Sequence, residues 1–316
     1  MKHSNRSSSS DWPDLPYGDW SGTAATLHMW TQIVGKIRLS QTPWTNHSWH
    51  VPLYLTTTGL GTSPIPYDGR CFEINFDFID HQLVIQSSDG ARRLISLEAC
   101  TVSAFYTAVL ENLRALNFDI RIYTTPSEMP DGIPFEQDTE HHHYDAEYAN
   151  RFWRTLLQVD RVFKEFRARF IGKCSPVHFF WGSFDLAVTR FSGREAPAHP
   201  GGVPNFPDWV AREAYSHEVS SAGFWPGGGG IDHAAFYSYA YPAPDGFSEA
   251  RVQPDGACWA SQLGEFLLPY REVQTAASPD DALLEFLQST YVSAAELANW
   301  DRSALECELG PEAAAT

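Results

Sequence analysis

Two short motifs recur in the same order in the two halves of this chain of 316 residues. Ile33–Lys36 reads Ile-Val-Gly-Lys and Phe170–Lys173 reads Phe-Ile-Gly-Lys, while Ile79–His81 and Ile231–His233 both read Ile-Asp-His. In each half, a helical pattern leads into the Gly-Lys, strand-like segments follow, and a second helical pattern closes the unit. This order favours an internal duplication, in which two similar units pack about a pseudo-two-fold axis and form a cleft between them.

Apolar residues at spacings of three and four predict two helices in each half. We expect these helices at residues 23–35, 105–116, 152–172 and 278–294. The first and the third are expected to end at Gly35 and Gly172, because glycine readily adopts the left-handed conformation that closes many helices.

Between the helices, apolar and polar residues alternate with a period of two, which is typical of strands. The alternation covers residues 49–58, 72–78, 83–85 and 94–97 in the first half, and 177–191, 214–222, 236–241 and 265–270 in the second. Each half therefore reads as a helix, a four-strand antiparallel sheet and a helix. The chain is assigned to the α+β class, with helices on one face of each sheet.

An acidic, proline-rich stretch at residues 123–148 shows no hydrophobic period and is interpreted as a linker. It divides the chain into a first α+β repeat, 12–122, and a second repeat with longer loops, 149–300. Residues 1–11 are expected to form a disordered tail, and residues 301–316 a C-terminal tail.

Composition excludes several classes of partner. The formal net charge of -17 opposes nucleic-acid binding, which depends on clustered Lys and Arg. No apolar stretch approaches the roughly 18 residues that a membrane span needs. The five cysteines form no Cys-x-x-Cys pair, so we expect reduced thiols in the cytoplasm. The sequence specifies neither a cofactor nor an oligomeric state.

Polar side chains are densest within the otherwise apolar stretch 172–194. On a regular strand, alternation predicts one apolar face and one face that carries Trp181, Ser183, Asp185 and Thr189. Rings and a carboxylate on one surface suit a polar organic ligand. The alternative is that these groups satisfy one another at an interface between the two repeats.

Three residues are candidates for acid–base catalysis: His178, Asp185 and His217. A histidine titrates near neutral pH and a carboxylate can act with it. His178 and Asp185 have opposite parity, so an uninterrupted strand sends them to different faces unless Gly182 forms a bulge. A structural role for the histidines remains the alternative.

Five further residues are candidates for ligand contacts, namely His50, Tyr54, Lys173, Trp181 and Arg190. No metal site is expected, because the run His141–His143 lies in the acidic linker and is typical of a solvated segment.

Four stretches resemble those of a bacterial family known only as a domain of unknown function. They are Trp49–Tyr54 (WHVPLY), Phe76–His81 (FDFIDH), Ser175–Asp185 (SPVHFFWGSFD) and Phe286–Tyr291 (FLQSTY). The resemblance covers roughly residues 12–300 and implies one family-wide unit. It brings no activity, ligand or catalytic residue with it.

Two functions from different classes remain open at the level of sequence. The one we favour is binding of a small polar organic molecule in a cleft between the repeats, either by a binding protein or by an enzyme with His and Asp acid–base groups. The other is a non-catalytic interaction or self-association protein that uses an aromatic sheet surface. An enclosed pocket that joins the named side chains favours the first, and a flat exposed aromatic face favours the second.

Overall fold

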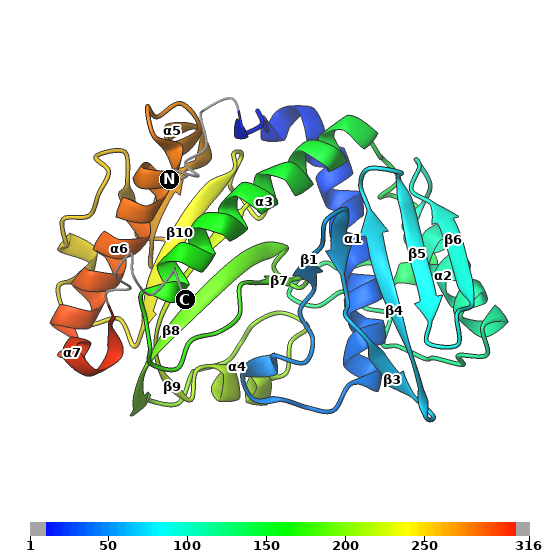
Figure 1. Cartoon of the computed structure of the whole chain (residues 1–316), viewed down its shortest axis with the longest axis horizontal. Coiled ribbons are helices and arrows are strands. Elements are labelled where there is room, and N and C mark those ends of the chain that lie inside the picture. Colours follow the sequence, from blue (N-terminus) through cyan, green and yellow to red (C-terminus); the bar gives the residue numbers. More distant parts are fainter. Residues whose placement is uncertain (1–10, 308–316) are drawn as a thin grey trace, which may run out of the picture.

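Two antiparallel sheets lie edge to edge in the computed structural model, which describes residues 11–307 (Figure 1). Residues 1–10 of the expected N-terminal tail and residues 308–316 of the expected C-terminal tail lie outside the described residues. The mixture of helices with two antiparallel sheets places the chain in the α+β class, as the sequence predicts.

The first sheet follows helix α1 (Tyr17–Gln41) and precedes helix α2 (Val102–Ala115). Its strands run in the order β1-β2-β4-β5-β6, with β3 paired to β4. Their bounds are β1 Tyr54–Leu55, β2 Gly59–Gly61, β3 Ile65–Tyr67, β4 Arg70–Asp77, β5 Gln82–Ser87 and β6 Arg92–Ser96. Trp30 of α1 stacks on Phe105 of α2 with ring centroids 4.4 Å apart, and Phe76 of β4 is fully buried against Phe105. Aromatic packing therefore fixes both helices to the same face of this sheet.

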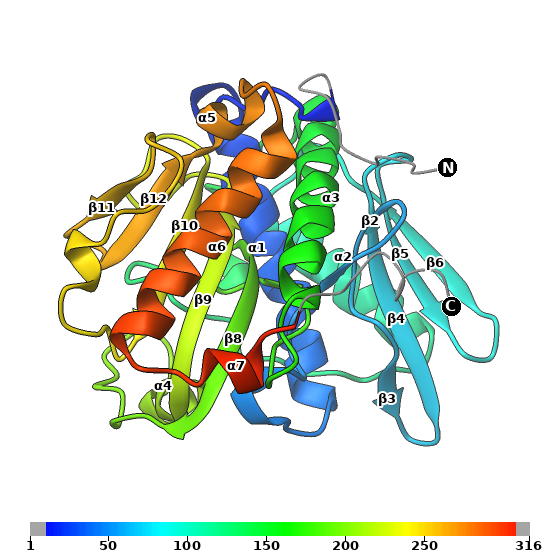
Figure 2. The same cartoon turned by 60° about the vertical axis from the view of Figure 1, so that its left-hand side comes forward.

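The second sheet follows helix α3 (Ala146–Ala168) and precedes helix α6 (Pro279–Leu297). Its strand order is β11-β12-β10-β9-β8-β7, and Figure 2 shows α3 and α6 side by side over it. The strand bounds are β7 His178–Phe180, β8 Asp185–Glu195, β9 His217–Trp225, β10 Ala235–Tyr241, β11 Cys258–Ala260 and β12 Glu265–Pro269. The described residues also form the short helices α4 Asp208–Ala214, α5 Tyr270–Gln274 and α7 Arg302–Leu305.

All four predicted helices are confirmed, but α1 and α3 each begin six residues before the predicted start, and their predicted C-terminal ends are wrong. Helix α1 continues through Gly35 to Gln41, because Gly35 serves there as a contact for Trp181 rather than as a stop. Helix α3 ends at Ala168, four residues before Gly172. The chain leaves the helix there because Phe170 pairs with Glu306, and residues 301–307 of the expected tail fold back as α7.

Within residues 11–307, each sheet has six strands instead of the predicted four. The added strands β2, β3 and β11 are three residues long, which is too short for alternation to show. The expected strand 177–191 is wrong as a single strand. It forms a hairpin in which β7 and β8 pair with Phe180 opposite Asp185, and Phe184 in the turn has φ 58.

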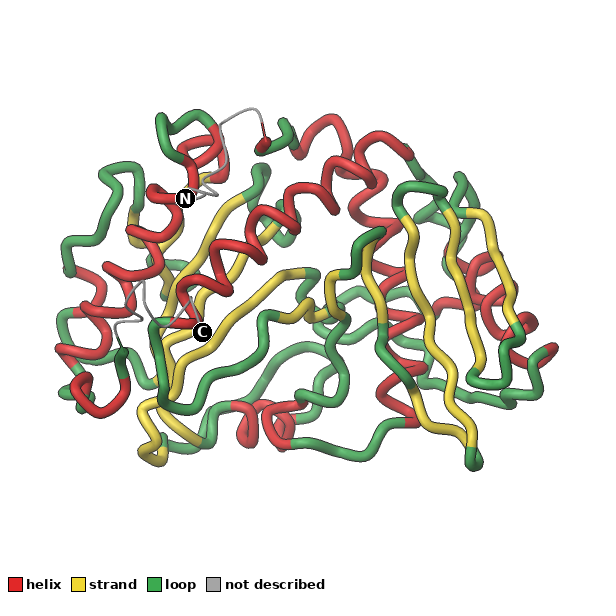
Figure 3. The backbone as a smooth tube through the Cα atoms, in the orientation of Figure 1, coloured by secondary structure: helices red, strands yellow, loops and turns green. Residues whose placement is uncertain are grey.

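The two sheets meet at the bridge between Leu53 and Phe179, where each backbone N–H donates to the other residue's carbonyl (2.9 and 2.8 Å). Figure 3 shows the strands of both sheets on either side of this junction. Leu53 and Phe179 are fully buried, and the hydrophobic core is one cluster that includes residues of both halves. No helix within 11–307 is long and apolar enough to cross a membrane.

Candidate functional site

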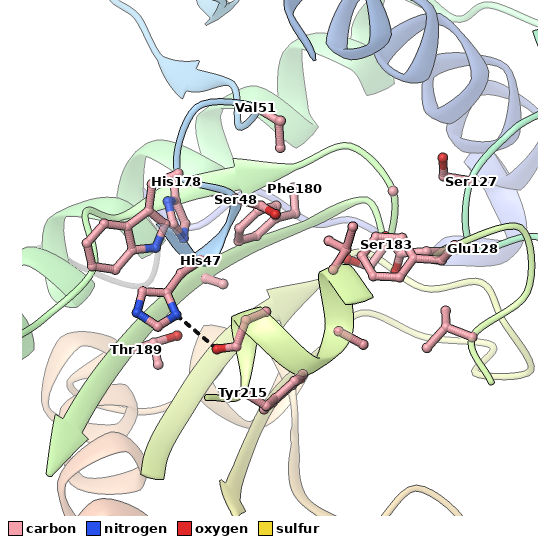
Figure 4. A pocket seen from close by; sticks show the side chains of 18 of the residues that line it. His47, Ser48, Val51, Ser127, Glu128, His178, Phe180, Ser183, Thr189 and Tyr215 are labelled. Atoms are coloured by element: carbon pink, nitrogen blue, oxygen red, sulfur yellow. Dashed lines mark hydrogen bonds between the residues drawn. The ribbon is translucent and has the colours of Figure 1, made fainter. Parts of the chain in front are cut away.

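A cavity of about 590 Å³ lies against the face of the second sheet that α3 and α6 leave uncovered (Figure 4). The turn η2 (Asn46–Ser48), residues 127–128 and residues 199–215, which include α4, form its other walls. The walls hold together because the His47 N–H donates to Glu213 Oε2 (2.7 Å) and His47 Nδ1 donates to the Ala214 carbonyl (3.0 Å). The cavity thus combines both halves of the chain with the stretch between them.

Strand alternation separates the two faces of the second sheet. Leu186 and Val188 of β8 point to the helices and are almost fully buried in the core. The intervening side chains face the cavity, and the registers place Thr189 beside Ser221 and Tyr239 beside Ser221. This confirms the predicted polar face for Asp185 and Thr189. Phe180 also lines the cavity, although its parity on a single strand would place it on the apolar face.

Asp185 is the most deeply buried acid of the cavity, at 4% exposure. The hydroxyl of Ser183 donates to its Oδ1 (2.5 Å), and the hydroxyl of Tyr237 donates to its Oδ2. Burial raises the pKa of Asp185, and the two hydroxyl donors act against this rise. Both donors are neutral, so the carboxylate has hydrogen bonds but no counter-charge from them.

Glu128 comes from the segment predicted to be a linker, and its carboxyl reaches the same end of the cavity as Ser183 (Figure 4). Its backbone has φ 63, and a Cβ placed on Gly182 would lie 2.0 Å from Glu128 Oε1. Glycine at 182 is therefore what makes room for the carboxyl. Burial, and then the charge of Asp185, raise the pKa of Glu128 to about 7.

This raised pKa predicts that the protein loses stability as pH rises. The folded state keeps the Glu128 proton between about pH 4.5 and pH 7, where the unfolded chain has released it, so the free energy of unfolding falls across that window. In Glu128→Gln the free energy of unfolding should decrease less steeply with pH across the same window. Urea denaturation of both proteins from pH 5 to pH 8 measures it, and an unchanged slope in the variant contradicts the assignment.

Tyrosines surround the carboxyls. The hydroxyls of Tyr215 and Tyr239 are 2.8 Å apart, and the rings of Tyr237 and Tyr239 stack at 6.1 Å. Glu265 of β12 lies near this group, and burial followed by the charge of Asp185 raises its pKa to about 7. Burial raises the pKa of Tyr215 to about 12, so the tyrosines are neutral hydrogen-bond donors near neutral pH.

Histidines occupy the other end of the cavity. Since a carbonyl can only accept, His47 carries its proton on Nδ1 toward Ala214, which leaves Nε2 to accept from Lys173 Nζ at 2.5 Å. His178 is 1% exposed, and its Nδ1 has no hydrogen-bond partner among the described residues. Burial, and then the charge of Arg38, lower the pKa of His178 to about 3, so this ring is neutral.

Trp181 closes the cavity against α1. Its Nε1 donates to the Val51 carbonyl (3.0 Å) and its ring occupies the space beside Gly35, where a Cβ would lie 2.2 Å from the indole. Gly35 therefore does not end the helix, as the sequence suggests, but leaves the space that the Trp181 ring occupies.

Gly35→Ala is expected to destabilise the protein by about 1–3 kcal/mol, because the displaced indole outweighs the gain in helix propensity of about 1 kcal/mol. Gly18→Ala is a matched control in the same helix, since nothing lies within 4 Å of its added Cβ. It should be neutral or stabilising. Urea midpoints read by tryptophan fluorescence compare the two, and equal midpoints would show that the indole is not displaced.

A family model described as a family of unknown function, DUF5996, matches residues 12–307. The chain belongs to this family. The resemblance seen over residues 12–300 of the sequence is thereby confirmed. No curated protein and no solved structure matches the chain.

In this DUF5996 chain, four predicted site residues line the cavity: His50, His178, Trp181 and Asp185. The hairpin turn at 181–184 brings His178 and Asp185 to one face of the sheet, which a single strand could not do. Lys173 lies outside the lining and reaches it through His47. Three others are not among the lining residues, namely Tyr54, Arg190 and His217.

The positions of these three have clear causes. Tyr54 packs beneath the Arg38 guanidinium, with 5.4 Å to the ring centroid. His217 lies at the start of β9, where its Nδ1 is 3.1 Å from the hydroxyl oxygen of Ser216. Arg190 has the parity of the helix-packed face and is fully buried there against Phe166.

Sequence reasoning missed Glu128, His47, Tyr215, Tyr237 and Tyr239. The alternation in Phe236–Tyr241, where every second residue is tyrosine, was a signal for two of them. Glu128 and His47 lie in loops whose path no periodicity encodes. Within residues 11–307, no three metal-ligating side chains gather as a metal site would require.

Proposed function

We propose that the cavity binds a small polar organic molecule. The observation that carries this proposal is the concave space of about 590 Å³ that joins Asp185, Glu128 and His178 with aromatic walls, in the size range of small-molecule sites. Polar groups at fixed positions among rings supply orientation, and the rings supply contact area.

The rival function, an aromatic surface for protein association, is less well supported. The sheet rings that it would use, such as Phe180, Tyr237 and Tyr239, face the interior of the cavity and are at most partly exposed. Exposed rings of this region, Trp44 and Trp209, are 53% and 58% exposed and also belong to the cavity lining.

Proton transfer is the chemistry that the lining groups can perform. Glu128 has the pKa of about 7 that suits a general acid or base near neutral pH, and it lies beside Asp185. The neutral His178 can accept a hydrogen bond from a ligand. We propose Glu128 and Asp185, rather than His217, as the acid–base groups of any reaction in this cavity.

Native mass spectrometry of protein purified from its own host tests the proposal. A retained molecule of defined mass, lost on denaturation and absent from a Gly182→Leu variant in which the new side chain fills the carboxyl end, supports it. Protein that carries no molecule, and that no mixture of cell metabolites stabilises in a thermal-shift assay, contradicts it. The variant's own thermal unfolding shows that it is folded.

We also propose that the two units arose by duplication. Each unit is an antiparallel sheet between two long helices. Ile79–His81 lies in the connection β4–β5 and Ile231–His233 in the connection β9–β10, and each connection joins the third and fourth strands counted from the junction of the two sheets. All five cysteines are free thiols, which supports a reducing compartment such as the cytoplasm.

A further inference from the structure

The acidic side chains that line the cavity give its lining a negative formal charge. Among the described residues that line it, Glu128 and Asp185 are the only acids, and none is a lysine or an arginine. Two lysines lie just behind the lining: Lys36 Nζ donates to the Ser127 hydroxyl (2.9 Å), and Lys173 Nζ donates to His47 Nε2. A ligand therefore meets two carboxyls and neutral groups.

The two carboxyls also lack a counter-charge from the protein. Glu128 makes no hydrogen bond or ion pair through its carboxyl with any residue of 11–307, while Asp185 receives bonds from two neutral hydroxyls. The charge of Asp185 raises the energy of the Glu128 charge, and burial disfavours both charges. A cation between them would relieve this repulsion.

Aromatic rings form the remaining walls, and they too favour positive charge. The electron-rich faces of tryptophan, tyrosine and phenylalanine attract cations at contact distance. Lys36 already lies over Trp181, and Lys173 lies over Trp49 and Phe191. The sheet rings that remain for a ligand include Phe180, Tyr237 and Tyr239.

A second, independent sign of a ligand lies at the other end. The ring of His178 is 1% exposed at the cavity, and its Nδ1 has no partner among the described residues. A buried polar atom without a partner is costly unless something else satisfies it. Nδ1 has almost no accessible surface with the ring as it stands, so a polar group on the ligand would satisfy it after a rotation of the ring.

We infer that the cavity binds an organic cation, with its ammonium group between Glu128 and Asp185 and its aromatic or aliphatic body among the rings. The inference rests on the proposed function and names its ligand class. The net charge of -17 attracts such a molecule to the protein, and an organic anion is repelled.

Three probes that share one skeleton test the charge: tryptamine, the alcohol tryptophol and the carboxylate indole-3-propionate. Isothermal titration of the full chain at pH 8 should give tryptamine a dissociation constant about 10-fold or more below that of tryptophol, with indole-3-propionate weaker still. The matched set 2-phenylethylamine, 2-phenylethanol and 3-phenylpropionate repeats the comparison with a smaller body.

Glu128→Gln should remove most of the preference for the amine and leave tryptophol unchanged. Glu147→Gln removes one negative charge from α3, at a side chain that is 72% exposed, and should leave all affinities unchanged. Equal or tighter binding of the alcohol or the carboxylate overturns the inference, as does a failure of every amine to bind. A retained anionic molecule in native mass spectrometry overturns it too, but leaves the proposed function in place.

Discussion

Replacing Asp185 with asparagine is expected to weaken binding of tryptamine by about 10-fold, which corresponds to about 1.4 kcal/mol. The carboxylate is the innermost charge of the cavity, and Ser183 and Tyr237 hold it in one orientation. Asparagine keeps the shape and an acceptor oxygen but removes the charge that an ammonium group needs. Isothermal titration at pH 8 measures the loss, and thermal unfolding shows whether the variant is folded.

His217→Ala provides the matched control. The sequence pairs His217 with Asp185 as a catalytic candidate, but this histidine is not among the cavity-lining residues. Its removal should leave the affinity for tryptamine within about twofold of the wild type. If His217→Ala abolishes binding while Asp185→Asn does not, the ligand lies outside this cavity.

Truncation of Arg190 to alanine is expected to destabilise the protein by about 3–4 kcal/mol, while the ligand affinity of the folded fraction stays unchanged. The guanidinium lies 3.5 Å from the ring centroid of Phe166 and 4.3 Å from that of Tyr291, and Nη2 donates to the Phe166 carbonyl. Alanine leaves a void between β8, α3 and α6. Urea denaturation measures the loss of stability.

Arg190→Met separates packing from charge. Burial lowers the pKa of Arg190 to about 10, and two of its nitrogens, Nε and Nη1, have no hydrogen-bond partner among the described residues. Since an incompletely paired buried charge contributes little to stability, methionine should recover all but about 1 kcal/mol by filling the same volume. A methionine variant as unstable as the alanine variant would show that the charge itself holds the helices to the sheet.

Arg190 and Asp185 show which properties of a strand residue its sequence pattern predicts and which it does not. Alternation correctly separates Leu186 and Val188 from Asp185 and Thr189, because side chains of a strand must point to opposite faces. The same rule assigns Arg190 to the apolar face, although its charge makes it look like a ligand contact. Arg190 is buried on that face because its guanidinium stacks on the Phe166 ring, a contact that only the tertiary structure shows.

The hairpin explains the largest error along the chain. The polar and apolar residues of 177–191 are compatible with one long strand, and the turn carries only Gly182 as a signal. Phe184 takes a left-handed φ that the tertiary contacts of its ring stabilise, including a 5.3 Å stacking contact with Phe152. Local propensity opposes such a turn, so the sequence could not predict that His178 would join Asp185.

The sequence by itself determined the elements that depend on local periodicity: the four long helices, the antiparallel strands, the α+β class and the family. It also identified Asp185, His178, Trp181 and His50, because polar groups in apolar stretches are conspicuous. Tertiary structure alone decided the cavity, since Glu128 and His47 reach it from loops with no periodic pattern. Their position depends on contacts between residues far apart in the chain, such as that between Glu128 and Gly182, and no local pattern encodes such contacts.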